Sequence, residues 1–258
     1  MKILISTGIY PPKTSGPAQY AKNMHDIWVG LGHDVKVKTY NIENKLPSGV
    51  RHLYYFFKII PSVIRSDFVF TLDTFSVGLP TALACVLFNK KFIIRTGGDF
   101  LWEGYVERTG DLVLLRDFYK TRINNLNLKE KTIFNLTKWV LNKTDILIFS
   151  TEWQRDIFME PYQLQKKYAD GKIKIVENRY EINHEDTSIK DDIKKLDFVA
   201  STRNLKWKNI ALLKQVFDDT DLKEKGLNLI TNEMPYGDFM KLMRDSYAVI
   251  LVSLGDIS

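Results

Sequence analysis

Two cations that follow a predicted strand are the clearest candidates for chemistry in this sequence. Arg203 and Lys208 stand five positions apart, shortly after the apolar segment 198–200. Ligands of parallel α/β sheets bind beside the carboxyl ends of the strands, and two cations there could bind a diphosphate through charge-assisted hydrogen bonds. The alternative is that both are solvated surface charges, and the spacing alone leaves the two interpretations open.

A loop with one glycine is a second candidate for phosphate binding. Residues 10–17 include Gly16 and separate the apolar segment 2–6 from a segment with helical periodicity. Backbone N–H groups at the amino end of a helix attract anions, and a glycine lets a phosphate approach the backbone closely. A plain connecting loop is the alternative interpretation of the same residues.

Three carboxylates follow other predicted strands. Asp73 comes after the segment 68–72. Asp99 and Glu103 come after the segment 92–95. At the carboxyl edge of a sheet such side chains could contact an acceptor molecule. Acidic side chains also stabilise turns and helix starts, and that structural role is the alternative for each of the three.

The elements that must position these residues alternate between strands and helices. Apolar segments predict the strands, and segments with apolar residues at helical spacing separate them. The predicted strands are 2–6, 34–40, 68–72, 92–95, 146–149 and 173–176. Helical patterns lie at about 76–89, 112–142 and 152–168. The first helix, which ends at Gly30 and Gly32, is expected to turn one face to the sheet: Tyr20, Met24, Ile27, Trp28 and Leu31. This alternation predicts a parallel sheet that is covered on both faces.

A polar stretch divides the chain into two predicted domains. Apolar periodicity stops after Glu177 and resumes at Phe198. We therefore predict an amino-terminal domain at 1–177, a linker at 178–196 and a second domain at 197–258. The second domain has predicted strands at 198–200, 227–230 and 247–252, and predicted helices at 209–217 and 236–246. Three strands are few for a doubly wound domain, so the second domain is expected to be incomplete.

Composition and charge narrow the class of protein. The 258 residues are 45% hydrophobic, 26% charged and 12% aromatic, which excludes disorder, collagen and coiled coil. The net charge of +6 is uneven, because residues 1–177 carry 25 Lys and Arg against 17 Asp and Glu, while residues 178–258 carry 12 against 14. The basic first part indicates an anionic partner: a phosphorylated substrate, an acidic lipid surface or nucleic acid.

Several other classes of protein are excluded by their missing motifs. No apolar run reaches the roughly 18–20 residues of a membrane span, and no signal peptide is expected. The single cysteine, Cys85, lies in an apolar segment, so no internal disulfide is expected and a cytoplasmic location is the natural one. The histidines and this cysteine lack metal-ligand spacing. Neither Gly-x-Gly-x-x-Gly after the first strand nor a Walker motif is present, which argues against dehydrogenases and Walker-type nucleotidases.

Taken in combination, the motifs resemble those of the retaining glycosyltransferases of family 4. The matching segments are IYPP (9–12), SGPA (15–18), LGHDV (31–35), STEW (150–153) and VEN (176–178), and Arg203 and Lys208 keep the family's Arg-x-x-x-x-Lys spacing. The resemblance covers nearly the whole chain. It implies an α/β protein of the GT-B type, with a complete Rossmann-like amino-terminal domain, a partial second Rossmann-like domain and a cleft between them.

The same resemblance implies roles for individual residues. The first domain of the family mainly binds the acceptor, and the second mainly binds a nucleotide-sugar donor. The residues that the resemblance places at the donor are Gly16, Arg203, Lys208 and Asp256. The residues expected at the acceptor are Asp73, Asp99 and Glu103.

Three departures from the family pattern limit what is carried over. Ser15 replaces the first of the paired loop glycines, and Gly98 precedes Asp99 where many relatives have His-Asp, so no catalytic residue is predicted. Asp256 aligns with a glutamate of the family. A second carboxylate would fall beyond Ser258, so we expect a chain truncated within the donor domain.

The resemblance implies a transferase that moves a sugar from a nucleotide-sugar to a glycan or lipid-linked acceptor with retention, in polysaccharide or glycolipid synthesis. Arg203, Lys208 and the Gly16 loop would stabilise the charge of the leaving diphosphate, and neither a metal nor a cofactor is expected. The alternative is a non-catalytic protein that binds a sugar nucleotide or a glycan. A nucleic-acid partner is not expected, because no recognisable nucleic-acid-binding module is evident.

A basic and aromatic segment at 51–61 indicates one more possible partner, an anionic membrane surface. Its sequence, RHLYYFFKIIP, suits peripheral contact with the anionic inner face of a membrane, where a lipid-linked acceptor would be presented. A helix of the protein core is the alternative. Four consecutive aromatic residues give the pattern no clear polar face, so the sequence leaves both interpretations open.

Overall fold

The computed structural model describes residues 1–13, 15–178, 196–200, 202, 204–218, 222, 224–231, 234 and 236–255. The chain forms two compact units. Unit 1 contains Met1–Trp102 and Phe118–Asn178, and unit 2 contains Glu103–Asp117 and the residues that follow Asn178 up to Asp256. The predicted linker at 178–196 lies outside the described residues except for its two end positions.

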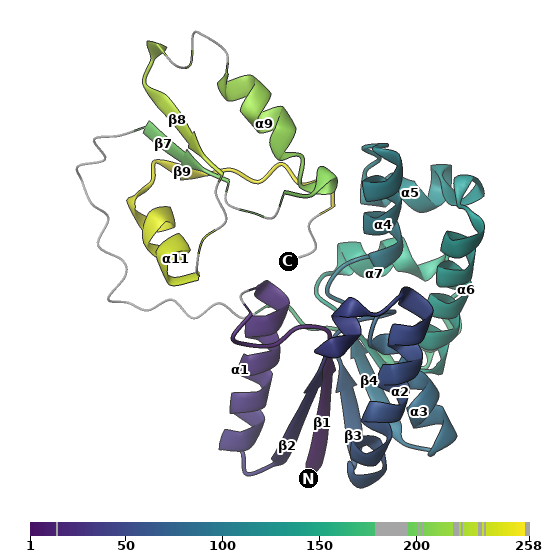
Figure 1. Cartoon of the computed structure of the whole chain (residues 1–258). Coiled ribbons are helices and arrows are strands. Elements are labelled where there is room, and N and C mark those ends of the chain that lie inside the picture. The colour runs from purple at the N-terminus through teal and green to yellow at the C-terminus, as the bar shows by residue number, and fades with distance from the viewer. Residues whose placement is uncertain are drawn as a thin grey trace. The chain divides into compact units, whose positions relative to one another are not determined.

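Unit 1 is built on a six-stranded parallel sheet with the strand order β2-β1-β3-β4-β5-β6 (Figure 1). The strands are β1 (Lys2–Thr7), β2 (Asp34–Thr39), β3 (Phe68–Thr71), β4 (Lys91–Arg95), β5 (Ile146–Phe149) and β6 (Ile173–Ile175). Ile5 of β1 pairs with Val37 on one side and Phe70 on the other. All six predicted strands of the first domain are therefore confirmed, with small shifts at their ends.

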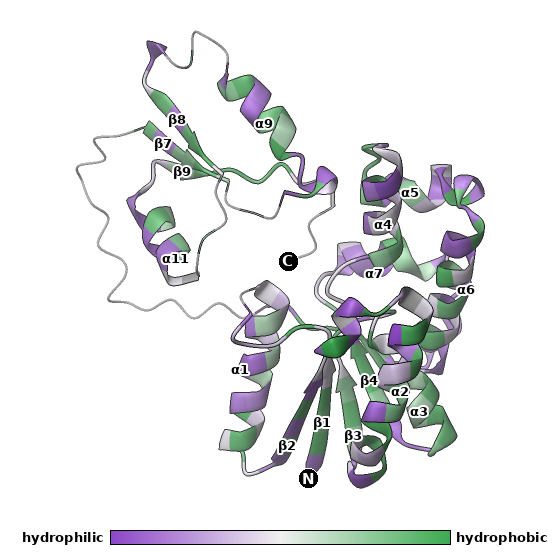
Figure 2. Cartoon of the chain, viewed as in Figure 1, coloured by the Kyte–Doolittle hydropathy of each residue, from purple (hydrophilic) through white to green (hydrophobic). Residues whose placement is uncertain are grey.

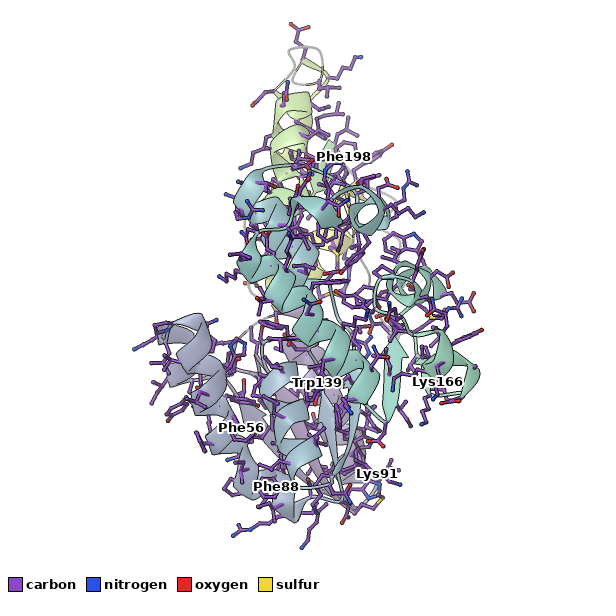
Figure 3. All side chains as sticks on the ribbon, turned by 90° about the vertical axis from the view of Figure 1, so that its right-hand side faces the viewer. Phe56, Phe88, Lys91, Trp139, Lys166 and Phe198 are labelled. Atoms are coloured by element: carbon purple, nitrogen blue, oxygen red, sulfur yellow. The ribbon has the colours of Figure 1, made fainter. Side chains whose placement is uncertain are left out.

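Helices surround this sheet. They are α1 (Gly16–Gly30), α2 (Ser48–Arg65), α3 (Gly78–Leu87), α4 (Phe100–Thr109), α5 (Leu115–Thr121), α6 (Leu128–Lys143), α7 (Glu152–Met159) and α8 (Gln165–Ala169), with short 3₁₀ turns η1 (Ile42–Lys45) and η2 (Ile123–Asn125). Helix α3 packs between α2 and α6. Phe56 of α2, Phe88 after α3 and Trp139 of α6 mark this layer in Figure 3.

The central strands form the core of unit 1. Ile3, Leu4 and Ile5 of β1 are buried, as are Val69 and Phe70 of β3. Figure 2 shows β1, β3 and β4 as mainly hydrophobic between helices of mixed character. Continuous apolar strands are typical of parallel sheets with both faces covered, as the sequence predicts.

The predicted packing face of α1 is wrong at two of its five positions. Ile27 is 55% exposed and Leu31 is 67% exposed. Ala18 and Ala21 are buried instead, and Trp28 packs edge-on against the ring of Phe70. The small alanine side chains let this face of the helix approach the sheet closely. Ile27 precedes Trp28 by one residue, which is a rotation of about 100° around the helix, so it points away from the sheet.

Two long helical patterns divide into shorter helices. The pattern at 112–142 becomes α5, η2 and α6, because a capping box starts a new helix at Asn127: its Oδ1 accepts from Glu130 N (2.9 Å), and Glu130 Oε2 accepts from Asn127 N (2.9 Å). The pattern at 152–168 becomes α7 and α8, with Gln163 between them in a left-handed conformation (φ 55°). Helix α4 is an element that the sequence analysis did not predict.

Unit 2 contains a three-stranded parallel sheet with the order β8-β7-β9. Its strands are β7 (Leu196–Val199), β8 (Leu227–Ile230) and β9 (Ala248–Val249), and its later helices include η4 (Lys206–Lys208), α9 (Ile210–Phe217) and α11 (Tyr236–Asp245). Strand β9 is shorter than the predicted 247–252. The core cluster consists of Ala200, Ile210 and Leu213, with partly buried apolar side chains around it.

Candidate functional site

A buried arginine lies at the carboxyl edge of the six-stranded sheet. Arg95 is the last residue of β4, and only 6% of it is exposed. Its Nη2 donates to Asn178 Oδ1 (2.7 Å) and to Ser150 Oγ (3.3 Å), and its guanidinium carbon lies 4.0 Å from the centre of the Tyr20 ring. Three strand ends and the second turn of α1 therefore meet at one guanidinium.

This arginine lacks a counter-ion among the residues that the structure describes. Burial lowers the pKa of Arg95, and no described carboxylate offsets that shift through an ion pair. Its Nε is buried and has no hydrogen-bond partner there. Burying a cation without a paired anion is costly, so this position is an electrostatically unusual one.

A buried amide lies beside the arginine cluster. Gln154, in the first turn of α7, is fully buried, and its Oε1 lies 3.0 Å from Thr96 Oγ1 and accepts from Ser150 N (3.3 Å). Its Nε2 has no hydrogen-bond partner among the described residues. Two unsatisfied donors, one from β4 and one from α7, thus belong to one connected set of polar groups.

Asp99, a predicted acceptor residue, caps a helix. Its Oδ1 accepts from Leu101 N and Trp102 N (both 3.0 Å), and its Oδ2 accepts from Tyr119 OH (2.5 Å), which lies 2.6 Å from Tyr162 OH. Burial raises the pKa of Asp99 to about 6, in spite of these hydrogen bonds. These contacts fit the alternative interpretation, in which the carboxylate stabilises a helix start. Acceptor binding by Asp99 stays a prediction.

Asp73 organises the turn between β3 and α3. Its Oδ1 accepts from Phe75 N (2.7 Å) and from Gly78 N (3.4 Å), and burial raises the pKa of its carboxyl. A Cβ at Gly78 would collide with the backbone carbonyl of Asp73, so the turn requires glycine at that position. The carboxyl is buried, while the residue as a whole remains partly exposed at the sheet edge.

Glu103, the third predicted acceptor residue, lies in the first turn of α4 and is partly exposed. A carboxylate is favoured at this position because the amino end of a helix carries partial positive charge. Helix α4 crosses the division between the units, so Asp99 belongs to unit 1 and Glu103 to unit 2. The role of Glu103 at an acceptor stays a prediction.

Gly16 begins α1, as the loop motif predicts. Ser15, the residue that departs from the family pattern, is the helix cap, and its Oγ accepts from Ala18 N (3.2 Å). A Cβ at Gly16 would meet no atom within 4 Å. The packing of the protein therefore does not require glycine here, and the space beside Gly16 is open.

Of the two predicted donor cations, the structure describes Lys208. It lies in η4, and its Nζ is 4.4 Å from the centre of the Trp207 ring. Trp207 is buried, and its carbonyl accepts from Leu254 N (2.9 Å). Lys206 donates from its backbone N to Glu107 Oε1 (2.6 Å) within unit 2. The other predicted donor residues, Arg203 and Asp256, lie outside the described residues.

Sequence reasoning missed Arg95, Ser150, Gln154 and Asn178 as a cluster. Arg95 ends a predicted strand, and Ser150 and Asn178 come within three residues of the ends of two others. The rule that ligands bind at the carboxyl ends of parallel strands, applied to every strand, would have brought these three together. The sequence gives no comparable signal for Gln154.

Segment 51–61 lies in α2 and has apolar side chains on two faces. Tyr55 and Ile59 are fully buried, as the core-helix alternative requires, whereas Leu53, Tyr54 and Phe57 are exposed. Within the described residues, no helix combines the length and apolar character of a membrane span. Peripheral membrane contact through this segment stays a prediction.

Searches among protein-family models and curated proteins find no match to this chain. Solved structures are similar to it. The UDP-GlcNAc 2-epimerase from Methanocaldococcus jannaschii aligns with a TM-score of 0.55 and 13% identity, over 96% of this chain and 78% of that one. An alpha-glucosyltransferase in complex with UDP aligns with a TM-score of 0.52 and 11% identity, over 98% and 73%.

A third similar structure is the S. aureus MnaA-UDP co-structure, with a TM-score of 0.51 and 10% identity, over 96% of this chain and 73% of that one. Identities this low show the fold alone. The fold is the GT-B-like architecture that glycosyltransferases and UDP-GlcNAc 2-epimerases share. The predicted fold class, α/β of the GT-B type, is confirmed.

Proposed function

We propose that this protein is a glycosyltransferase, which moves a sugar from a nucleotide-sugar donor to a glycan or lipid-linked acceptor with retention of configuration. The observation that carries the proposal is the GT-B-like fold, which the chain shares with proteins in complex with UDP. The motifs that resemble family 4 favour transfer over epimerisation. UDP is accordingly the first nucleotide to test.

Cations after β7 would serve the donor. Lys208 lies beside Trp207 at the end of η4, and Arg203 stands five positions earlier in the sequence. In a retaining transfer, the leaving diphosphate gains negative charge, and cations at its oxygens lower the barrier by stabilising that charge. Gly16, with open space at its Cα, and Asp256 complete the proposed donor residues.

Carboxylates that follow β3 and β4 in the chain would serve the acceptor. Asp73 is partly exposed at the end of β3, and Asp99 and Glu103 lie at the start of α4. We propose that Asp73 and Glu103 contact acceptor hydroxyls and that Asp99 contributes by holding the start of α4. For a lipid-linked acceptor, the exposed side chains of α2 would contact an anionic membrane surface, and replacing Leu53 and Phe57 by serine would lower co-sedimentation with anionic vesicles.

Incubation with a panel of UDP-, GDP- and ADP-sugars tests the reaction. We expect the release of one nucleoside diphosphate, and a product whose anomeric configuration, measured by NMR, equals that of the donor. The Lys208→Ala variant should lose this release, whereas Lys214→Ala, which alters an exposed lysine of α9, should keep it.

Other products would redirect the proposal. A sugar altered at carbon 2 and still attached to its nucleotide would identify an epimerase, the activity named for a similar structure. Binding of a nucleotide-sugar with no turnover against any acceptor tried would favour the non-catalytic binding protein. Either result would contradict glycosyl transfer.

A further inference from the structure

The guanidinium of Arg95 has more donors than the protein uses. Its two hydrogen bonds both leave from Nη2, toward the neutral oxygens of Asn178 and Ser150. Nε is buried without a partner, and Nη1 has none among the described residues. In a planar guanidinium, Nε–H points the same way as one N–H of Nη2. An anion that takes the place of Asn178 Oδ1 could therefore accept from Nε and Nη2 through two parallel bonds, the fork that binds a carboxylate or phosphate.

The surroundings of Arg95 favour an anion over a neutral group. Among the described residues no carboxylate pairs with it, so its positive charge is not neutralised locally. Tyr20, whose ring covers the guanidinium, belongs to the second turn of α1, and the first turn of α1 contains no acidic residue. The partial positive charge of that helix end therefore adds to the potential at the same edge of the sheet.

The site is close to solvent although Arg95 itself is buried. Asn178, whose Oδ1 occupies the Nη2 position, is an exposed residue, and Tyr20 is partly exposed. A ligand oxygen could replace the amide oxygen of Asn178 without opening the sheet. Gln154 Nε2, also buried without a described partner, is one further donor in the connected cluster.

We propose that Arg95, beside Ser150 at the adjacent strand end, binds the acid group of an anionic acceptor, a phosphate or carboxylate attached to a sugar, which takes the place of the Asn178 amide oxygen. This inference rests on the proposed function in one respect, because it assigns the bound anion to the acceptor that unit 1 receives. The binding site itself depends on the geometry of Arg95 alone.

Calorimetric titration of the whole chain without any nucleotide tests the site. The probes are glucose 1-phosphate, glucuronate and neutral glucose. We expect one of the two anions to bind with a Kd on the order of 1 mM or lower, and glucose to bind more weakly by at least about tenfold. The phosphate and carboxylate arms distinguish the two acid groups, and failure of both anions to bind would overturn the proposal.

Variants then locate the binding. Arg95→Gln should weaken anion binding by about tenfold or more, while Arg65→Gln, at an exposed position at the end of α2, should leave it unchanged. Because a sugar phosphate could also occupy the donor site, Lys208→Ala must retain the binding. Loss in Lys208→Ala with full binding in Arg95→Gln would overturn the proposal.

A second variant keeps the test decisive if Arg95→Gln does not fold. Asn178→Asp places a carboxylate 2.7 Å from Nη2, as an internal competitor for the ligand. It should raise the melting temperature and weaken anion binding by about tenfold, whereas Asn178→Ala should preserve the binding. Equal anion affinity in Asn178→Asp and the wild type would refute the site. Anion binding that depends on Arg95, in a chain that binds no nucleotide-sugar, would instead refute the proposed function alone.

Discussion

The carboxyl edges of the two sheets hold their charged side chains differently. In unit 1, Arg95 and Asp99 are buried, and each makes hydrogen bonds to groups on other elements. In unit 2, Lys206 is exposed, and Lys208 is partly exposed beside Trp207. Buried charges interact strongly because the local dielectric is low, while exposed charges are screened by water and salt.

This difference indicates how much side-chain ordering each edge would need in order to bind an anion. The edge of unit 1 is organised by the protein before any ligand arrives, since the hydrogen bonds of Ser150 and Asn178 already orient Arg95. Lys208 of unit 2 is partly exposed, so it would keep much of its hydration until a ligand arrived. Pre-organisation raises affinity by lowering the cost of ordering side chains on binding.

The largest expected effects are losses of stability from cavities in the two cores. They test whether the core of unit 1, like its sheet edge, is more fully buried than that of unit 2. Phe149 of β5 is fully buried and packs edge-on against Phe158, so Phe149→Ala should lower the free energy of unfolding by about 3–5 kcal/mol. Leu213→Ala, in the smaller core of unit 2, should cost about 2–3 kcal/mol. Urea titrations followed by circular dichroism measure both, and an equal or reversed order would break the comparison.

A pH dependence should distinguish the buried edge from the exposed one. The pKa of Asp99 is raised to about 6 in the folded protein, against about 3.9 in an unfolded chain. The folded state therefore favours the protonated carboxyl of Asp99. The stability that this protonated carboxyl contributes is complete below about pH 4 and is lost as the pH rises to about 6. The loss amounts to about 2–3 kcal/mol.

Asp99→Asn should remove this slope, because an amide oxygen still accepts the hydrogen bonds of the α4 cap and does not titrate. The free energies of unfolding of both proteins, measured at pH 4, 5, 6 and 7, give the difference between them. We expect this difference to change in favour of the variant as the pH rises. A constant difference would show that Asp99 does not titrate in this range.

Smaller changes in stability should distinguish Gly78, which is packed against backbone, from Gly16, which lies beside open space. Gly78→Ala should destabilise the protein by about 1–3 kcal/mol, because the added Cβ collides with the Asp73 carbonyl. Gly16→Ala should change stability by no more than about 0.5 kcal/mol, since its Cβ enters open space. If Gly16 approaches a donor phosphate, the alanine variant should still bind nucleotide more weakly, and unchanged nucleotide affinity would remove Gly16 from the donor site.

Much of the fold could be predicted from the sequence because buried parallel strands are continuously apolar. The strands at 68–71 and 227–230 follow directly from that pattern. Helix faces were harder to predict, since Ala18 and Ala21 allow a close approach that larger apolar residues such as Ile27 do not signal. Helix α4 was missed because its start depends on the Asp99 cap, which the sequence also allows as an acceptor contact.

Sequence patterns pointed to some candidate residues and missed others. Gly16 and Lys208 were proposed from their loops, and their roles at a donor stay predictions. Arg95 was not proposed, because a charged residue at the end of a strand has the pattern of a surface position. Its burial depends on Tyr20, Ser150 and Asn178, which are distant in sequence. Such long-range neighbours leave no local pattern.

Calorimetric titration of UDP into the chain and into two lysine variants tests most directly whether a nucleotide-sugar donor site follows β7. We predict that UDP binds the wild type, that Lys208→Ala weakens the binding by about 1.5–3 kcal/mol, and that Lys214→Ala leaves it unchanged. Absence of UDP, GDP and ADP binding, or equal affinity in Lys208→Ala and the wild type, would contradict this account.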